Sequence, residues 1–184
     1  MITTLLLAAG RGRRFGSQKL LARLADGRSV IAASVANLRV DRERLLVVTR
    51  NDPSLLEELA ALGVEVVMND RADEGMAGSL AAGVAVSSDS KGWLIALGDM
   101  PFVNPATVAA VKACGLPSAI VVPVHLGQRG HPVFFGADYR AGLLSLRGDR
   151  GARTLFERHA DGVKLIDVTD PGVLRDIDFP ADIL

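Results

Sequence analysis

The sequence has one cysteine, no net charge and no long apolar run, and each of these shortages excludes a class of protein. The single cysteine, Cys114, excludes an intramolecular disulfide framework and has no neighbours at metal-ligand spacing. The formal net charge is +0 at pH 7, so no global field draws the chain onto nucleic acid or an anionic membrane. No apolar stretch approaches the length of a membrane span. We therefore expect a cytoplasmic protein that binds neither nucleic acid nor membranes.

The first ten residues also lack the flanks of a secretory signal. Residues 1–10 are apolar and end in small residues, as the core of a signal peptide does. A signal peptide places its positive charges before the apolar run, whereas here Arg11, Arg13 and Arg14 follow it. We therefore interpret this run as the first strand of the fold.

The sequence is rich in apolar residues, and their proportion is typical of a globular protein. They make up 49% of the chain, and charged residues make up 23%. A chain of 184 residues is long enough for one well-buried core and too short for two, so we expect residues 1–184 to form a single domain.

Short apolar runs alternate with longer helix-like segments. Runs such as 5–8 and 94–97 are apolar at successive positions, as expected when helices cover both faces of a parallel sheet. We predict a three-layer, Rossmann-like α/β fold with a mostly parallel sheet. The runs 118–126 and 131–136 are separated by Gly-Gln-Arg-Gly, which predicts a hairpin there. The predicted strands are 2–8, 44–50, 64–69, 92–99, 118–126, 131–136 and 163–168, and the predicted helices are 30–38, 54–62, 78–86, 107–113 and 153–159.

Glycines and cations share the loop after the first predicted strand. Gly10, Gly12 and Gly16 lie there among three arginines and a lysine. A P-loop is excluded, because the sequence lacks its Gly-Lys-Ser/Thr ending. A dinucleotide-binding fingerprint fits better, but its third glycine comes one position late and arginines occupy positions that need close helix packing. A solvated basic turn also stays open, although it does not explain why glycines and cations share one strand end.

The number of charges favours a triphosphate as the ligand of this loop. A nucleoside triphosphate carries roughly four negative charges, against about two for a dinucleotide pyrophosphate. Arg11, Arg13, Arg14 and Lys19 supply a matching set of positive charges. Glycines let the backbone approach phosphate oxygens, and a following helix N-terminus adds partial positive charge. We therefore predict that the loop binds a polyphosphate.

The same segment resembles a family signature. Residues 7–10 read Leu-Ala-Ala-Gly, and Arg14, Phe15, Gly16 and Lys19 follow at the spacing found in the nucleotidyltransferases of the molybdenum cofactor group. This group includes molybdenum cofactor cytidylyltransferases and molybdopterin-guanine dinucleotide synthases. The resemblance implies a nucleotide-diphospho-sugar transferase type of fold, with Arg14 and Lys19 on the triphosphate as catalytic residues. The nucleotide-binding residues that it implies in this segment are Leu7, Ala8, Ala9, Gly10, Gly12, Arg14 and Lys19.

A carboxylate follows the central predicted strand. Asp99 comes at the carboxyl end of an apolar run, where open α/β sheets bind their ligands. Near a polyphosphate, a carboxylate is suited to hold Mg²⁺, which takes oxygen ligands and shares them with phosphates. The alternative is that Asp99 caps the helix starting near Pro105, for which Asn104 is the better placed residue. Residues 98–102 also resemble the metal-binding segment of the same family, so we predict Asp99 as a catalytic metal ligand.

A second metal ligand is predicted near the end of the sequence. Residues 176–182 resemble the Asp-x-Asp-x-Pro-x-Asp ending of the family, which assigns the metal to Asp178. The alternative is a cluster at the start of a last helix beginning near Pro180, in which Asp178 or Asp182 only complements the helix dipole.

A stretch of small residues follows the third predicted strand. Its resemblance to the family's Gly-Met-x-x-Ser segment implies nucleotide contacts from Gly75, Gly78 and Ser79, with Asn69 as a further candidate. The alternative is a surface loop in which Ser79 is a helix N-cap and the glycines serve packing.

Three residues are candidates for binding the acceptor substrate. His131 matches the family's Gly-His-Pro segment, although a lone histidine before a strand is often a structural hydrogen-bonding residue. Arg150 and Arg153 open a predicted helix and form a possible second anion site, for which a solvated helix start is the alternative. His125 and His159 lack partners at ligand spacing and are predicted to be structural.

Together these residues predict an Mg²⁺-dependent transfer of a nucleotidyl group to an acceptor phosphate, with release of pyrophosphate. The resemblance implies molybdopterin as the acceptor and a molybdoenzyme or its chaperone as a downstream partner. It favours CTP over GTP, because Ala9 stands where guanylyl-transferring relatives tend to carry glycine.

Two other functions stay open. A nicotinamide-dependent oxidoreductase would use Gly10 and Gly12 for a pyrophosphate and Arg50 for a 2′-phosphate, but it leaves Lys19 and Asp99 without roles. A cofactor carrier or insertion protein of the same fold would bind nucleotide without turnover.

Overall fold

The computed structural model describes residues 1–10, 15–16, 18–70, 75–148 and 152–183. Its strands are β1 (Thr3–Leu7), β2 (Arg44–Thr49), β3 (Glu65–Met68), β4 (Gly92–Leu97), β5 (Ile120–His125), β6 (Gln128–Arg129), β7 (Val133–Gly136) and β8 (Val163–Asp167). Within the described residues these eight strands form one sheet in the order β3-β2-β1-β4-β7-β5-β6, and β8 pairs with β5. Strands β1 to β4 pair in parallel and β7 is antiparallel to both β4 and β5. The mostly parallel sheet and the predicted hairpin are both confirmed.

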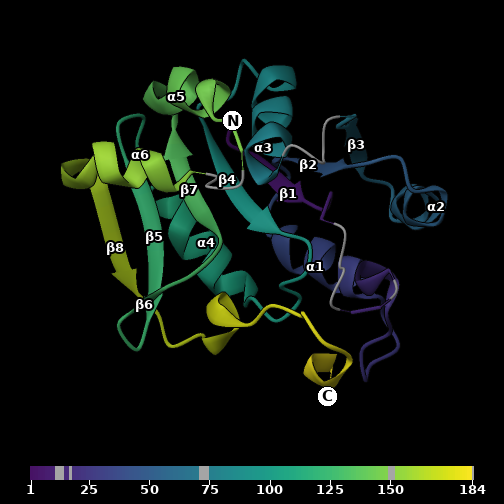
Figure 1. Ribbon diagram of the computed structural model, residues 1–184. Helices are drawn as coiled ribbons and strands as arrows, with labels where there is room; N and C mark the ends of the chain where they lie inside the picture. The colour runs from purple at the N-terminus through teal and green to yellow at the C-terminus, as the bar shows by residue number, and fades with distance from the viewer. Residues whose placement is uncertain (11–14, 17, 71–74, 149–151, 184) are drawn as a thin grey trace.

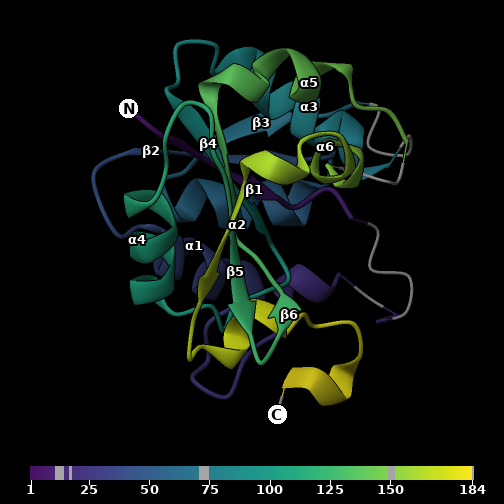
Figure 2. The same ribbon diagram turned by 90° about the vertical axis from the view of Figure 1, so that its left-hand side faces the viewer.

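Helices cover both faces of the sheet (Figures 1 and 2). One face carries α1 (Val30–Leu38), α2 (Pro53–Ala61) and α4 (Pro105–Ala113), and the other carries α3 (Met76–Val86), α5 (Arg140–Ser145) and α6 (Arg153–Arg158). This arrangement confirms the predicted three layers. Among the described residues no helix combines the length and apolarity needed to cross a membrane. The short 3-10 helices are η1 (Lys19–Leu21), η3 (Ala137–Tyr139), η4 (Ala160–Gly162), η5 (Pro171–Leu174) and η6 (Pro180–Ile183).

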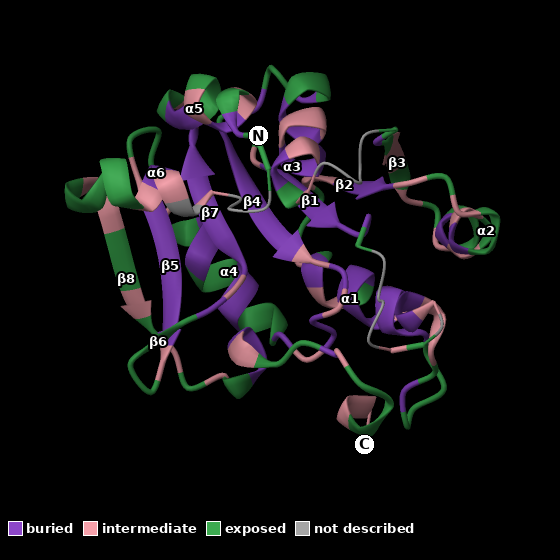
Figure 3. Ribbon diagram, in the orientation of Figure 1, coloured by how far each residue is buried: buried purple, intermediate pink, exposed green. Residues whose placement is uncertain are grey.

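The central strands are buried because their successive side chains enter two separate cores. In β1, Leu6 packs in the core beneath α1, α2 and α4, whereas Leu5 and Leu7 pack in the core beneath α3, α5 and α6. Strand side chains alternate between the two faces, so a strand covered on both faces is apolar at successive positions. Figure 3 shows the resulting contrast between the buried central strands and the exposed edge strand β8.

The five predicted helices begin at, or within two residues of, their predicted first residues. Asn104 caps α4 by accepting a hydrogen bond from the N–H of Ala106 at 2.8 Å, so Asp99 is not needed as a cap. Helices α3 and α4 each begin two residues earlier than predicted, at Met76 after Gly75 and at Pro105. Helix α5 was not predicted.

The order of the strands defines where a ligand can bind. The chain leaves β1 toward β2 on one side and later returns to β4 on the other side, so the strand order reverses between β1 and β4. Open α/β sheets bind ligands beyond the carboxyl ends of the strands at such a point. The C-terminal segment, residues 168–183, reaches the same end of the sheet (Figure 1), where the N–H of Ile177 donates to the carbonyl of Asp99 at 2.9 Å.

Candidate active site

Three residues singled out from the sequence converge beyond the carboxyl ends of β1 and β4. Lys19 begins η1, and its side chain is 10% exposed. Its Nζ donates to Asp99 Oδ2 at 2.6 Å and to Asp178 Oδ1 at 3.1 Å. These contacts join residues that are 80 and 159 positions apart in the sequence. One ammonium group therefore lies between the two carboxylates that we predict as metal ligands.

Burial and charge act on Lys19 in opposite directions. Burial disfavours the ammonium form and lowers the pKa of Lys19, but the hydrogen bonds and charges of Asp99 and then Asp178 outweigh it. The net result is a pKa above the ordinary value for lysine. Lys19 is therefore protonated at neutral pH and available as a counter-ion for either carboxylates or phosphates.

The C-terminal segment presents Asp178 to this cluster. Ile177 is fully buried, and its N–H donates a hydrogen bond to the backbone carbonyl of Asp99. Asp182 Oδ2 accepts from the N–H of Asp178 at 2.9 Å and from the N–H of the next residue at 2.7 Å. Asp182 lies in the first turn of η6, as the alternative of a helix-start carboxylate expects. The Asp178 carboxylate enters the site instead.

The pair of carboxylates fits a hard divalent cation that binds together with a polyphosphate. The Asp99 and Asp178 side chains are 23% and 32% exposed, so both are accessible from solvent. Among the described residues, no group of three or more His, Cys, Asp or Glu side chains could hold a metal ion. Mg²⁺ commonly takes one or two carboxylates and completes its shell with water and substrate phosphates. Both residues could therefore serve as ligands of a metal that a triphosphate helps to hold.

The end of β1 provides a buried backbone next to this cluster. Leu7, Ala8 and Ala9 are buried, and the N–H of Ala8 extends the parallel pairing with β2. Gly10 is exposed, and a Cβ added there would meet no atom within 4 Å. Packing among the described residues therefore does not require glycine at this position, whereas close approach of a ligand to the backbone would. The other predicted residues of this loop, Gly12 and Arg14, lie outside the described residues.

A buried polar pair connects the end of β3 to α3. Asn69 Nδ2 donates to Ser79 Oγ at 2.9 Å, and both residues are buried. Ser79 is the fourth residue of α3, so the alternative that it caps this helix is wrong. The N-cap is Gly75, whose φ of +100° favours glycine, and Gly78 is half-buried in the first turn. Nucleotide contacts by Gly75, Gly78 and Ser79 stay predictions.

His131 lies two residues before β7, beside the carboxyl end of β4. Its N–H donates to the carbonyl of Val173 at 3.0 Å, and a Cβ added to Gly130 would lie 2.3 Å from that same oxygen. Burial lowers the pKa of His131, and the negative charge of Asp99, which raises it, does not outweigh this effect. The ring is therefore neutral at pH 7. The C-terminal segment therefore fixes the backbone of His131 as well as that of Asp99.

The remaining predicted acceptor residues are not brought to this cluster by anything that the structure describes. Arg150 lies outside the described residues, and Arg153 begins α6 with a side chain that is not described. The two other histidines make structural contacts, as predicted. His125 Nδ1 lies 3.0 Å from the carbonyl of Val168, and the ring of His159 packs edge-on against a tyrosine.

Sequence analysis missed a contact that fixes the residue before Lys19. Gln18 Nε2 donates to Asp52 Oδ2, and Asp52 also caps α2 by accepting from the N–H of Leu55 at 3.1 Å. This contact ties η1 to the end of β2. The Asp-Pro-Ser start of α2 is a recognisable cap in the sequence, but no local pattern indicates its second partner.

The lysine and the two carboxylates lie where three-layer α/β folds bind their ligands, and their chemistry suits a polyphosphate with a divalent metal. The chain belongs to the family of the MobA-like NTP transferase domain, which matches residues 4–163. The predicted family resemblance and fold class are thereby confirmed. The match ends before the C-terminal segment, so Asp178 and Asp182 lie beyond it.

Similar chains include proteins of different names. A nucleotidyl transferase from Methanothermobacter thermautotroptrophicus, Mth528, is 30% identical with a TM-score of 0.84, covering 99% of this chain and 94% of that one. Rv0371c from Mycobacterium tuberculosis H37Rv is 30% identical with a TM-score of 0.83, covering 99% and 95%, and it has also been solved in complex with manganese. Nicotine blue oxidoreductase from Paenarthrobacter nicotinovorans is 27% identical, covering 96% of this chain and 92% of its own length. The purine catabolism protein PucB from Bacillus subtilis (strain 168) is 30% identical, covering 96% and 91%.

Proposed function

We propose that this chain transfers a nucleoside monophosphate from a nucleoside triphosphate, with CTP favoured, to the phosphate of molybdopterin. The observation that carries the proposal is the position of Lys19 between Asp99 and Asp178 at the point where the strand order reverses. Membership of an NTP transferase family supports the reaction class. The choice of molybdopterin and of CTP rests on the sequence resemblance, and the preference for CTP rests on Ala9.

In the proposed reaction, an oxygen of the acceptor phosphate forms a bond to the α-phosphorus of the nucleotide. The bond from the α-phosphorus to the oxygen bridging it to the β-phosphate breaks, and pyrophosphate leaves. A phosphate monoester is already nucleophilic, so alignment and charge neutralisation are the protein's main contributions. Lys19 turns from the carboxylates to the phosphate oxygens, to which its three N–H groups can donate hydrogen bonds. The reaction needs no covalent enzyme intermediate. Asp99 and Asp178 would hold Mg²⁺, which would supply further neutralisation of the triphosphate.

The other predicted residues complete the proposal. Arg14 binds the triphosphate, while His131, Arg150 and Arg153 bind the acceptor. Delivery of the product to a molybdoenzyme or its chaperone rests on the same resemblance, whereas a cytoplasmic location rests on the single cysteine and on the absence of a signal-peptide pattern.

A second candidate function is favoured by the name of one relative. The 27% identity to nicotine blue oxidoreductase supports an oxidoreductase, and the nicotinamide cofactor is suggested only by the spacing of Gly10 and Gly12. In that case Gly10 and Gly12 contact a pyrophosphate and Arg50 contacts a 2′-phosphate, whereas the cluster around Lys19 has no assigned role. A cofactor-binding or insertion protein is the third candidate, and it differs by binding nucleotide without releasing pyrophosphate.

The test is pyrophosphate release with Mg²⁺ and molybdopterin, comparing CTP, GTP and ATP. We expect release with CTP, reduced at least about a hundredfold in Asp99→Asn because a group that stabilises transition-state charge is lost. Asp26→Asn, which alters an exposed carboxylate paired with Arg28, is the matched control and should retain the wild-type rate. Oxidation of a reduced nicotinamide cofactor without pyrophosphate release would favour the oxidoreductase. CTP binding without either activity would favour the carrier.

A further inference from the structure

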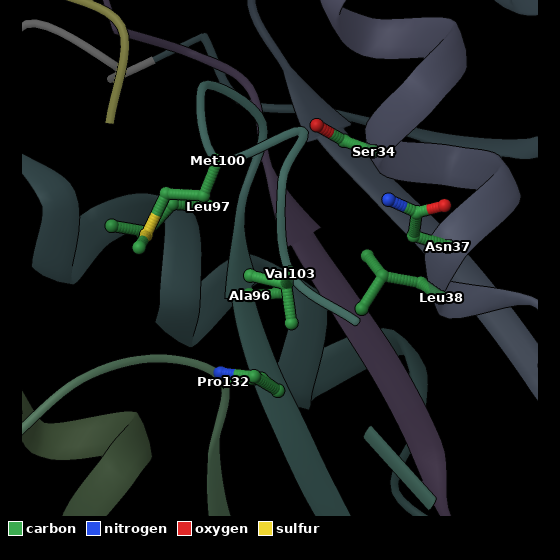
Figure 4. A pocket seen from close by; sticks show the side chains of 8 residues that line it. All are labelled: Ser34, Asn37, Leu38, Ala96, Leu97, Met100, Val103 and Pro132. Carbon is green, nitrogen blue, oxygen red and sulfur yellow. The ribbon is translucent and has the colours of Figure 1, made fainter. Parts of the chain in front are cut away.

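The turn that carries Asp99 is held by two side chains of α1. Ser34 Oγ donates to the carbonyl of Gly98 at 2.9 Å, and Asn37 Nδ2 donates to the carbonyl of Pro101 at 2.8 Å. These two carbonyls lie on either side of Asp99 in the sequence. Ser34 and Asn37 are three residues apart, so they share one face of the helix. Figure 4 shows both side chains pointing from α1 toward the turn.

The turn is tied down on its other sides as well. The N–H of Gly98 donates to the carbonyl of Leu7 at 2.9 Å, which continues the pairing of β1 with β4. The carbonyl of Asp99 itself accepts from the N–H of Ile177 at 2.9 Å. Met100 is buried and is one of the residues that line the pocket between α1 and β4 (Figure 4). Three of the four carbonyls from residue 98 to residue 101 are therefore hydrogen-bonded to α1 or to the C-terminal segment.

The side chains of Ser34 and Asn37 hydrogen-bond only backbone carbonyls of the turn, whereas the Asp99 carboxylate accepts from Lys19. Serine and asparagine are weaker helix formers than alanine, so helix propensity does not explain their positions in α1. Ser34 is 2% exposed, and a buried hydroxyl is costly unless it is hydrogen-bonded, as it is here. Both contacts orient Asp99 without occupying the oxygens that a metal ion or Lys19 would use.

We propose that Ser34 and Asn37 are positioning residues for the carboxylate of Asp99. The inference rests on the proposed function, in which that carboxylate holds the divalent metal. The two residues touch neither metal nor nucleotide and act only through the turn between Gly98 and Pro101. Loss of the groups that orient a metal ligand typically costs about 10–100-fold in metal affinity or activity.

The test measures the Mn²⁺ bound beyond that bound by CTP alone, by electron paramagnetic resonance of the free ion with and without the protein, together with the Tm. The variants are Ser34→Ala, Asn37→Leu and the double variant. The matched control is Tyr139→Phe, which removes one side-chain hydrogen bond to a backbone carbonyl, that of Ser118 at 3.0 Å, away from the site. We expect the double variant to bind Mn²⁺ about 10–100-fold more weakly and to lose turnover at limiting Mn²⁺ in proportion. The control should lower the Tm alone.

Two outcomes would overturn the proposal. One is unchanged Mn²⁺ affinity in variants whose Tm falls as it does in the control, because Ser34 and Asn37 would then only support the fold. The other is a wild-type protein that binds no Mn²⁺ with CTP, because Asp99 would then hold no metal. The half-buried Asn37 can be tested alone if the double variant does not fold. Mn²⁺ binding that depends on Ser34 and Asn37 without any pyrophosphate release would support the positioning role and reject the proposed function.

Discussion

Lys19 lies where a divalent cation would share the oxygens of Asp99 and Asp178, at 2.6 Å and 3.1 Å from them. An ammonium group and a divalent metal ion repel each other when both contact the same carboxylate oxygens. A triphosphate gives the ammonium another anionic partner. Nucleotide binding should therefore strengthen metal binding, and metal binding should strengthen nucleotide binding by the same factor.

Replacing Lys19 by methionine separates these effects. In Lys19→Met without nucleotide, we expect Mn²⁺ affinity to rise about tenfold. The ammonium group that stabilises the two carboxylates in their metal-free state is then gone. We expect turnover to fall about a hundredfold or more, because the phosphates lose a cation. Titration of free Mn²⁺ and assay of pyrophosphate release measure the two effects.

The chain offers a matched control for this variant. Lys112 is also buried between two carboxylates, with Nζ at 3.0 Å from Asp41 and 3.3 Å from Glu43. Lys112→Met should lower stability and keep turnover. Unchanged or weaker metal binding in nucleotide-free Lys19→Met would contradict competition between the ammonium and the metal.

Among the elements, the C-terminal segment joins parts of the site that come from distant strands. Asp170 Oδ2 accepts from the N–H of Asn104 at the start of α4. Val173 then accepts from His131, and Ile177 donates to Asp99. Displacement of this segment would therefore disturb several predicted site residues together.

Gly130 tests how closely this segment must pack. A Cβ there would lie 2.3 Å from the carbonyl oxygen of Val173, which is backbone and cannot rotate away. Gly130→Ala should therefore lower the free energy of unfolding by about 1–3 kcal/mol and reduce pyrophosphate release. Gly127→Asn in the same hairpin is the control, because its φ of +78° tolerates asparagine and a Cβ there has open space. Equal urea midpoints for Gly130→Ala and the wild type would show that the segment can shift without cost.

The elements also show what the sequence could predict. Strands β1 and β4 were predictable because both faces are covered, and their ends located the Leu7 and Asp99 regions correctly. Helix α5 was missed because it has six residues and no side-chain cap. The contact between Lys19 and Asp178 spans 159 positions, so only the family resemblance suggested that they act together. Ser34 carries no local signal, since a serine in a helix indicates nothing about the turn that it will meet.

For the whole molecule, His131 predicts a loss of stability in acid. Its pKa in the folded protein is lowered below the ordinary value of 6.5, chiefly by burial. As the pH falls below 6.5, the unfolded chain gains a proton at this ring that the folded chain binds less readily. The free energy of unfolding should therefore decrease as the pH falls through this window and should be fully retained above it. Urea unfolding at a series of pH values should show a shallower acid decline in His131→Gln. Identical slopes in the two proteins would contradict this assignment.

The cluster of Lys19, Asp99 and Asp178 also has a consequence for synthesis of the protein. The chain emerges from the ribosome with its N-terminus first, so β1, η1 and β4 emerge well before the C-terminal segment. A nascent chain that has reached β8 can hold the sheet and Lys19 but only one of the two carboxylates. Emergence of residue 178 from the ribosome is then the last step in assembling the site, and a product terminated before it could bind a nucleotide without the complete carboxylate pair.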